Sequence, residues 1–185
     1  MTITTTAPTA DSYDEADAIT GVRALLRLMG EDPDREGLQD TPARVVKAYR
    51  ELAARPGDPA QLLGRVFTDT DYDSDEMIAV GPIRFVSLCE HHLLPFTGDA
   101  FVAYIPDGDR VVGLSKIPRV VEHYAQRPQV QERLTTQIAA AMNDHLQPRG
   151  VAVVIRSNHS CMGLRGVREP DAAMVTSKLL GAFKG

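Results

Sequence analysis

Two short clusters of cysteine and histidine constrain the fold of this chain more than any other feature of its sequence. The first is a Cys-Glu-His-His run that begins at Cys89, and the second is a His-Ser-Cys run that ends at Cys161. Together they hold both cysteines and three of the five histidines of the protein. If the clusters share one site, the fold must bring together two segments about 70 residues apart.

The spacing within each cluster favours a three-ligand zinc site. In a helical turn, Cys89 and His92 lie on one face because they are three residues apart, and His91 points elsewhere. In an extended segment, His159 and Cys161 lie on the same side. Two thiolates and one imidazole leave the fourth zinc position open for water, as in catalytic sites. His91 and His159 are then free as acid–base candidates.

Other uses of the two cysteines stay open on spacing alone. They could form a disulfide, act as a redox pair or be small buried hydrophobic residues. A disulfide needs an oxidising compartment, and the N-terminal segment has neither the basic nor the apolar region of a signal peptide. A cytoplasmic location is therefore expected.

Composition limits the class of protein. The chain has 185 residues, 43% of them hydrophobic, which fits one domain with a core plus an appendage. Its apolar runs are shorter than the ~20 residues that span a membrane, so no membrane partner is expected. The net charge of −5 argues against nucleic acid as a partner. An anionic ligand would need a local basic cluster.

Such a cluster is suggested by pairs of basic residues spaced three apart, Arg44 with Lys47 and Lys116 with Arg119, and by Arg165 after the second cysteine. The simpler interpretation of any one pair is a solvated helix face. Several pairs near a metal site would form a polyphosphate pocket.

Periodicity divides the chain into a tail, an appendage and a body. Residues 1–14 are aperiodic and are predicted to be disordered. Residues 15–61 are predicted to form a helical appendage, with helices over about 14–29 and from Asp40 to about 54. Residues 62–185 form the body, with strands expected at 77–88, 98–105, 111–114 and 151–155. Helices are expected at 116–126 and from Pro128 to about 146, while the tail from residue 171 reads equally as strand or helix. This order predicts an α+β fold with helices on one face of the sheet.

The sequence resembles the GTP cyclohydrolase I family. The run Cys-Glu-His-His-Leu-Leu-Pro-Phe at 89–96 carries much of the resemblance. The match runs from about residue 20 to the end of the chain. Its other segments occur in the family's order, at residues 30–38, 40–44, 102–106, 113–117, 127–135, 150–153, 159–162 and 165–167.

The resemblance implies a tunnelling fold, in which an antiparallel sheet carries two helices on one face. It also implies a homo-oligomer, typically a decamer of two stacked pentamers, with active sites between subunits. The expected substrate is GTP, the expected products are 7,8-dihydroneopterin triphosphate and formate, and the only expected cofactor is Zn²⁺.

Carried over by position, the family's zinc ligands are Cys89, His92 and Cys161, in agreement with the spacing argument. Zinc lowers the pKa of bound water to ~7, and the resemblance implies that the resulting nucleophile adds to C8 of guanine. The resemblance implies that His159 protonates N7 and that His91 shuttles protons near the imidazole and ribose.

Further substrate contacts follow only from the resemblance. Ser115 matches a residue near the sugar, and Glu132 matches the carboxylate that binds the Watson–Crick edge of guanine, with Gln131 beside it. The triphosphate-binding positions correspond to all five basic residues already singled out, Arg44, Lys47, Lys116, Arg119 and Arg165.

Two departures from the family pattern bear on assembly. The sequence ends at Gly185, where members usually continue into a further helical stretch, and Met174 lies where threonines are common. A paralogue dedicated to a pterin or deazapurine metabolite is one alternative. A catalytically silent zinc- and nucleotide-binding oligomer is another, although that class is expected to lose His91, His159 or Glu132.

Overall fold

The N-terminal part of the chain folds as a small helical unit. The computed structural model describes residues 14–68, 76–108 and 110–184, and the chain divides into two compact units between Glu51 and Leu52. The first contains α1 (Glu15–Leu28), the 3-10 turn η2 (Glu36–Leu38) and all of α2 (Thr41–Leu52) except its last residue. Asp14 caps α1 by accepting a hydrogen bond from the Ala16 amide. Both predicted helices are present. Of the predicted disordered tail, residues 1–14, residues 1–13 lie outside the described ranges, and Asp14 is the cap of α1.

The division between the units falls ten residues before the predicted boundary at 61–62. Residues 52–61 group with the second unit because α3 (Pro59–Leu63) packs against two of its helices. Leu63, at the end of α3, has no exposed surface. This short helix has too few residues to show a periodic pattern in the sequence.

The second unit is built on a five-stranded sheet in the order β5-β2-β3-β6-β7. Its strands are β2 (Ile78–Cys89), β3 (Pro95–Ile105), β5 (Pro128–Gln129), β6 (Gly150–His159) and β7 (Met174–Gly181). All neighbouring strands are antiparallel except β5, which runs parallel to β2. A separate two-stranded ladder joins β1 (Val66–Phe67) to β4 (Val111–Val112).

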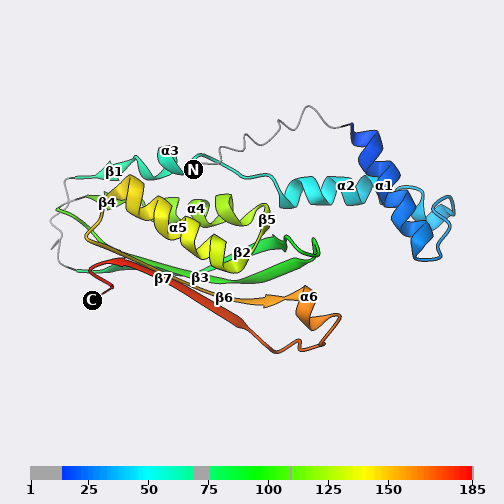
Figure 1. The fold of residues 1–185 in the computed structure, drawn as a ribbon. Coiled ribbons are helices and arrows are strands. Elements are labelled where there is room, and N and C mark those ends of the chain that lie inside the picture. Colours follow the sequence, from blue (N-terminus) through cyan, green and yellow to red (C-terminus); the bar gives the residue numbers. More distant parts are fainter. Residues whose placement is uncertain (1–13, 69–75, 109, 185) are drawn as a thin grey trace, which may run out of the picture. The chain divides into compact units, whose positions relative to one another are not determined.

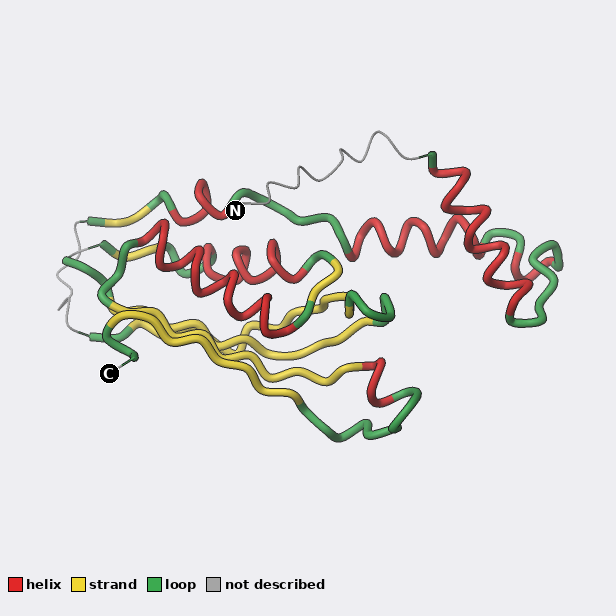
Figure 2. The backbone as a smooth tube through the Cα atoms, viewed as in Figure 1, coloured by secondary structure: helices red, strands yellow, loops and turns green. Residues whose placement is uncertain are grey.

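Two longer helices cover one face of this sheet, as Figures 1 and 2 show. They are α4 (Lys116–Ala125) and α5 (Gln131–Leu146), and the short α6 (Ser160–Gly163) follows β6. The predicted α+β architecture, an antiparallel sheet with two helices on one face, is thereby confirmed. No helix within the described ranges is long and apolar enough to cross a membrane.

The prediction that Pro128 opens a helix is wrong. Pro128 and Gln129 form the edge strand β5, which pairs with Leu88 and Cys89 at the end of β2. A proline fits an edge strand because its missing N–H removes no interior ladder bond. The helix begins at Gln131 instead, and the two-residue strand ties its start to the end of β2.

The sheet extends further than the apolar runs indicate. β6 continues past the predicted end at residue 155 to His159, and β3 begins at Pro95 rather than Gly98. Their register aligns Phe96 with His159. The ambiguous tail is a strand, β7, whose residues alternate between partly buried and exposed at the sheet edge.

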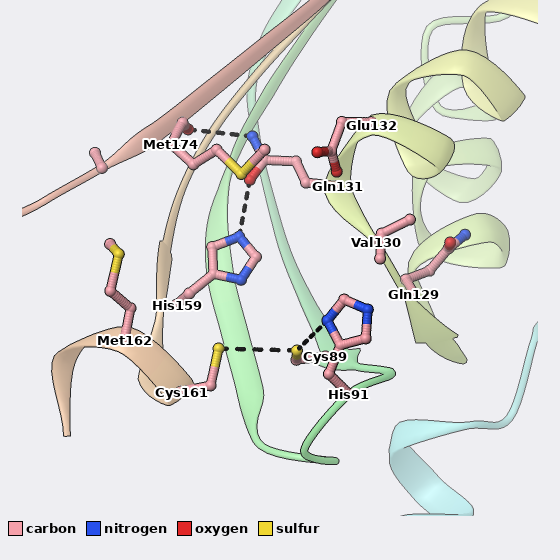
Figure 3. A pocket seen from close by; sticks show the side chains of 11 residues that line it. Cys89, His91, Gln129, Val130, Gln131, Glu132, His159, Cys161, Met162 and Met174 are labelled. Carbon is pink, nitrogen blue, oxygen red and sulfur yellow. Dashed lines mark hydrogen bonds between the residues drawn. The ribbon is translucent and has the colours of Figure 1, made fainter. Parts of the chain in front are cut away.

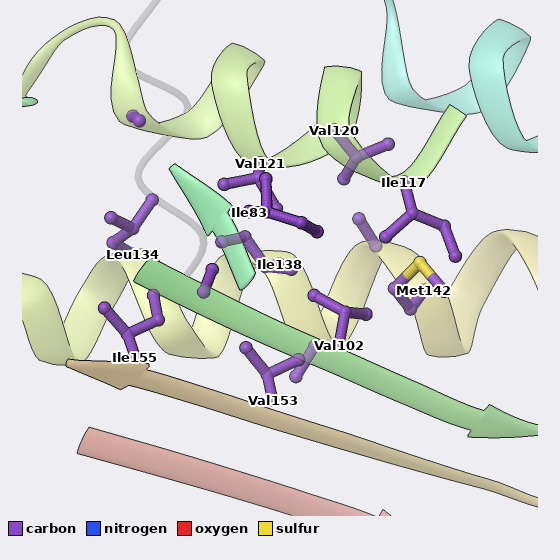
Figure 4. Close-up of a cluster of buried hydrophobic side chains, with 14 of the residues drawn as sticks. Ile83, Val102, Ile117, Val120, Val121, Leu134, Ile138, Met142, Val153 and Ile155 are labelled. Atoms are coloured by element: carbon purple, nitrogen blue, oxygen red, sulfur yellow. The ribbon is translucent and has the colours of Figure 1, made fainter. Parts of the chain in front are cut away.

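The core lies between the sheet and the helices α4 and α5 (Figure 4). Its centre holds fully or almost fully buried aliphatic side chains from both layers: Val102, Ile117, Val120, Val121, Leu134, Ile138, Met142, Val153 and Ile155. These helices present one apolar stripe to the sheet, as expected for surface helices.

Replacing Ile138 with alanine is expected to lower the free energy of unfolding by about 2–5 kcal/mol. The side chain is fully buried in this core, so its removal leaves a cavity. Met142→Leu in the same helix keeps the volume and should cost less than about 1.5 kcal/mol. Urea denaturation at one fixed protein concentration tests both, and equal losses would contradict the cavity argument.

Candidate metal centre and active site

The first cluster is positioned by the end of β2 and the turn that follows it. The Cys89 amide donates to Leu94 O at 2.8 Å, and Cys89 O accepts from the amides of His92 and Leu93 at 3.3 and 2.7 Å. Glu90 anchors the turn, because its amide donates to Gln129 O and its carboxylate pairs with Arg133 of α5. The Cys-Glu-His-His run is thus fixed to the start of α5.

Three side chains converge on a possible metal position. The Cys89 and Cys161 sulfurs lie 3.8 Å apart, and Nδ1 of His92 lies 3.9 Å from the Cys89 sulfur. All three ligand atoms lie within 4.8 Å of one another. Both cysteines are free thiols, and their separation far exceeds the ~2.05 Å of a disulfide bond.

The geometry of this triad suits zinc. Two thiolates that bind tetrahedral zinc at ~2.3 Å lie about 3.8 Å apart, which matches the sulfur–sulfur distance here. Burial raises the pKa of the Cys161 thiol, and the adjacent Cys89 raises it further. A raised pKa favours the neutral thiol. A dication between the sulfurs would favour the thiolate form instead.

His91 does not project away from the cluster as the helical-turn argument predicts. Its Nδ1 lies 3.9 Å from the Cys89 sulfur, the same separation as that of His92. The tight turn after β2, in which Leu93 has a φ of 53°, brings both imidazoles to the same sulfur. The rings are nearly perpendicular, with centroids 6.3 Å apart.

The second cluster also differs in its local conformation. His159 ends β6, but Cys161 lies in the short helix α6 rather than in an extended segment. The two side chains nevertheless line the same pocket, of about 490 Å³. We call it the Cys89 pocket; it is lined by Cys89, His91, Gln129, Val130, Gln131, Glu132, His159, Cys161, Met162, Ala173 and Met174 (Figure 3).

His159 is held firmly in this pocket. Its ring stacks on the buried Phe96 with centroids 4.4 Å apart and planes 7° from parallel. Its Nε2 lies 3.0 Å from Oε1 of Gln131. Burial lowers the pKa of His159, and the nearby carboxylate of Glu132 opposes that shift.

Glu132 lines the pocket from the first turn of α5, and Gln131 beside it is almost completely buried. An exposed carboxylate next to a histidine can both accept hydrogen bonds from a ligand and favour the charged imidazole. The structure therefore brings together seven of the predicted site residues: Cys89, His91, His92, Gln131, Glu132, His159 and Cys161.

Arg165 also lies beside the metal triad. Its Nη1 is 3.1 Å from Nε2 of His92, on the side of the ring away from the Cys89 sulfur. The guanidinium is exposed, so it places a positive charge next to the pocket in reach of an anionic ligand.

The remaining predicted residues lie elsewhere in the chain. Ser115 lines a separate pocket of about 850 Å³ with Phe67 and Leu114, and Arg119 lines one of about 250 Å³ with Glu122. Lys116 is the first residue of α4.

Arg44 and Lys47 belong to the first unit, on α2. There, Arg44 pairs with Asp40 at 3.0 Å and Lys47 with Glu51 at 4.0 Å. Both are exposed pairs of residues four apart on or next to one helix, which contribute little to stability.

Sequence reasoning missed the aromatic ring that stacks on His159 and the thioether walls of the pocket. Phe96 belongs to the motif at 89–96, and its stacking on His159 depends on the register between β3 and β6. Met162 and Met174 add apolar, polarizable walls. The motif at 89–96 contained the signal for Phe96, but only the strand pairing shows which ring it meets.

Comparison with known proteins adds an independent finding. The family model described as GTP cyclohydrolase I matches residues 18–185. A protein of Rhodopirellula baltica named GTP cyclohydrolase 1 is 53% identical over 175 residues, which cover 94% of this chain and 75% of that protein. Proteins of the same name from Mycobacterium ulcerans and Carboxydothermus hydrogenoformans are also 53% identical. The first match covers 97% of this chain and 89% of the relative, and the second covers 88% and 83%.

Among solved structures, the apo form of an archaeosine synthase QueF-Like is similar at a TM-score of 0.47 and 18% identity. The match covers 60% of this chain and 98% of that one.

Proposed function

The chain belongs to the GTP cyclohydrolase I family and is an enzyme of that class, and from this premise we propose that the Cys89 pocket is where GTP is converted to 7,8-dihydroneopterin triphosphate and formate. The observation that carries the proposal is the meeting of a metal-capable triad with two further histidines and a carboxylate in one pocket. Hydrolysis of a purine ring needs a nucleophile, a proton donor and a group that recognises the base. The pocket has a candidate for each.

Cys89, His92 and Cys161 are proposed to hold Zn²⁺, because their donor set and spacing fit it. When bound there, zinc supplies Lewis acidity and a water whose pKa is lowered to ~7, so that a nucleophile for C8 of guanine exists at neutral pH. With these three residues as ligands, a fourth position would be left for water.

The two histidines are proposed to move protons. His159 lies on the wall of the pocket beside Cys161. Its proposed role is to protonate N7, which would make C8 more electrophilic. His91 lies beside Cys89 and can shuttle protons during ring opening and the later rearrangement of the ribose.

Glu132 is proposed to select guanine. Its carboxylate can accept from N1–H and the 2-amino group, a donor pair that adenine lacks. A base without this donor pair loses these charge-assisted hydrogen bonds to the carboxylate, so adenine should bind more weakly than guanine.

Triphosphate binding is proposed to involve Arg44, Lys47, Lys116, Arg119 and Arg165, with Ser115 near the ribose. Of these, Arg165 lies beside the metal triad, whereas Ser115 and Arg119 line other pockets of the second unit. This separation supports a homo-oligomer, proposed as a decamer of two pentamers, in which one copy supplies Ser115, Lys116 and Arg119 to the Cys89 pocket of another.

A cytoplasmic location is also proposed, because a metal site with two thiolate ligands needs reduced cysteines.

The test is incubation of the zinc-loaded protein with GTP, with formate and the fluorescence of the oxidised pterin as readouts. Wild type is expected to release both, and His91→Ala should be slower by roughly 10²–10⁴-fold because it lacks a proton shuttle. Formate without pterin would show ring opening alone and overturn the product assignment. No turnover by a folded, zinc-loaded oligomer would instead favour a silent nucleotide-binding paralogue.

A further inference from the structure

The Gln131 side chain lies at the centre of a buried polar cluster that fixes the orientation of its amide. The residue is 1% exposed. Its Nε2 donates to the main-chain oxygens of Ile155 and Met174 and to Oγ1 of Thr176, each at 3.1 Å. Main-chain oxygens only accept hydrogen bonds, so the NH₂ group must point toward them. If the amide were flipped, Oε1 of Gln131 would face the main-chain oxygens of Ile155 and Met174, which cannot donate a hydrogen bond.

The opposite end of the amide must then accept. Oε1 of Gln131 lies 2.5 Å from the Ser157 hydroxyl and 3.0 Å from Nε2 of His159. An amide oxygen has no hydrogen to give, so Nε2 of His159 must carry one. In the neutral imidazole only one ring nitrogen is protonated, and Nδ1 is therefore left with its lone pair.

The imidazole is also prevented from turning over. It stacks on Phe96 across the β3–β6 ladder, and the hydrogen bond to Gln131 holds its far edge. In Figure 3, Nε2 points toward Gln131, while the other ring nitrogen is on the side facing Cys89 and His91. Turning the ring over would replace Nε2 with carbon at the Gln131 oxygen.

We propose that Gln131 is a positioning residue that commits Nε2 of His159 to a fixed hydrogen bond, so that every proton exchanged between His159 and the substrate passes through Nδ1. The proposal rests on the proposed function, and it changes the predicted role of Gln131, whose amide has no group left to offer guanine. The proton balance is simple: Nδ1 accepts a proton from solvent water, gives it to N7 of the purine and regains its lone pair. The Nε2 hydrogen stays in place throughout.

The kinetic test compares two variants of the same cluster. Gln131→Met removes the acceptor and should lower kcat for formate release roughly 10- to 100-fold, as when a partner that orients a functional histidine is lost, with KM unchanged. Thr176→Val removes one acceptor at the other end of the amide and leaves Oε1 on His159. It should keep the wild-type kcat even if the protein is less stable. A raised KM with unchanged kcat in Gln131→Met would indicate a guanine contact and overturn the proposal.

The structural test needs no turnover. Magic-angle-spinning NMR of the zinc-loaded protein with ¹⁵N-labelled histidine reports which ring nitrogen is protonated, and the His159 signals are assigned by their loss in His159→Gln. Wild type and Thr176→Val should show protonated Nε2 and unprotonated Nδ1, and Gln131→Met should show a mixture. A wild-type spectrum with protonated Nδ1 would refute the proposal. This holds even if Gln131→Met fails to fold or GTP is not the substrate, because the spectrum is recorded without GTP.

Discussion

Cys161→Ala is expected to abolish metal binding and to lower formate release from GTP by at least roughly 10⁴-fold. The Cys161 sulfur is one of only two thiolates in the triad and lies 3.8 Å from the other. A cation held by two ligands loses the charge balance and geometry that favour zinc. The loss of its several kcal/mol of Lewis-acid assistance corresponds to a rate change of this size.

The measurement combines zinc content by plasma mass spectrometry with the formate assay. Wild type stripped with a chelator should recover activity when zinc is restored, whereas Cys161→Ala should not. The circular dichroism spectrum of the variant should stay that of wild type, because Cys161 is only partly buried in the short helix α6. Full activity in a zinc-free variant would rule out a catalytic metal at this triad.

Gly98→Val is expected to destabilise the second unit by at least about 5 kcal/mol, the range of the most severe single substitutions. A Cβ at Gly98 would lie 2.1 Å from Arg156 O and 2.6 Å from the Ser157 Cβ, both on the paired strand β6. The main chain of β6 cannot yield without breaking the ladder that carries His159. Loss of activity should therefore accompany loss of stability.

Gly21→Ala is the matched control for this substitution. Gly21 lies within α1, and an added Cβ has nothing within 4 Å of it. Alanine in a helix interior is favoured over glycine by roughly 0.5–1 kcal/mol, so no destabilisation is expected. Denaturant unfolding of both variants measures their free energies of unfolding. A Gly98→Val protein as stable as wild type would contradict the β3–β6 register.

Much of the site was predictable because its chemistry is local in sequence. The motif at 89–96 and the second cluster identified the triad of Cys89, His92 and Cys161, which the structure does bring together. The orientation of His91 was not predictable, since it depends on a tight turn with a left-handed residue at Leu93.

The parts of the fold that have local sequence signals were also predictable. Helices α1, α2 and α4 show clear periodicity, and their predicted bounds agree with the structure to within about two residues. The errors fell where tertiary pairing overrides local signals. Pro128 reads as a helix start, but Pro128 and Gln129 pair with the end of β2. β7 alternates in burial, yet only its place beside β6 distinguishes strand from helix.

The topology also has a consequence for the order in which the protein matures. Cys89 ends β2, Cys161 follows β6, and these strands are joined only through β3 in the sheet. A cation that joins the two cysteines therefore closes a loop of about 70 residues. The entropic cost of closing this loop must be offset mostly by strand pairing. With the proposed zinc site, metal capture is expected to be a late event in folding, and zinc uptake should report that the three central strands have found their register.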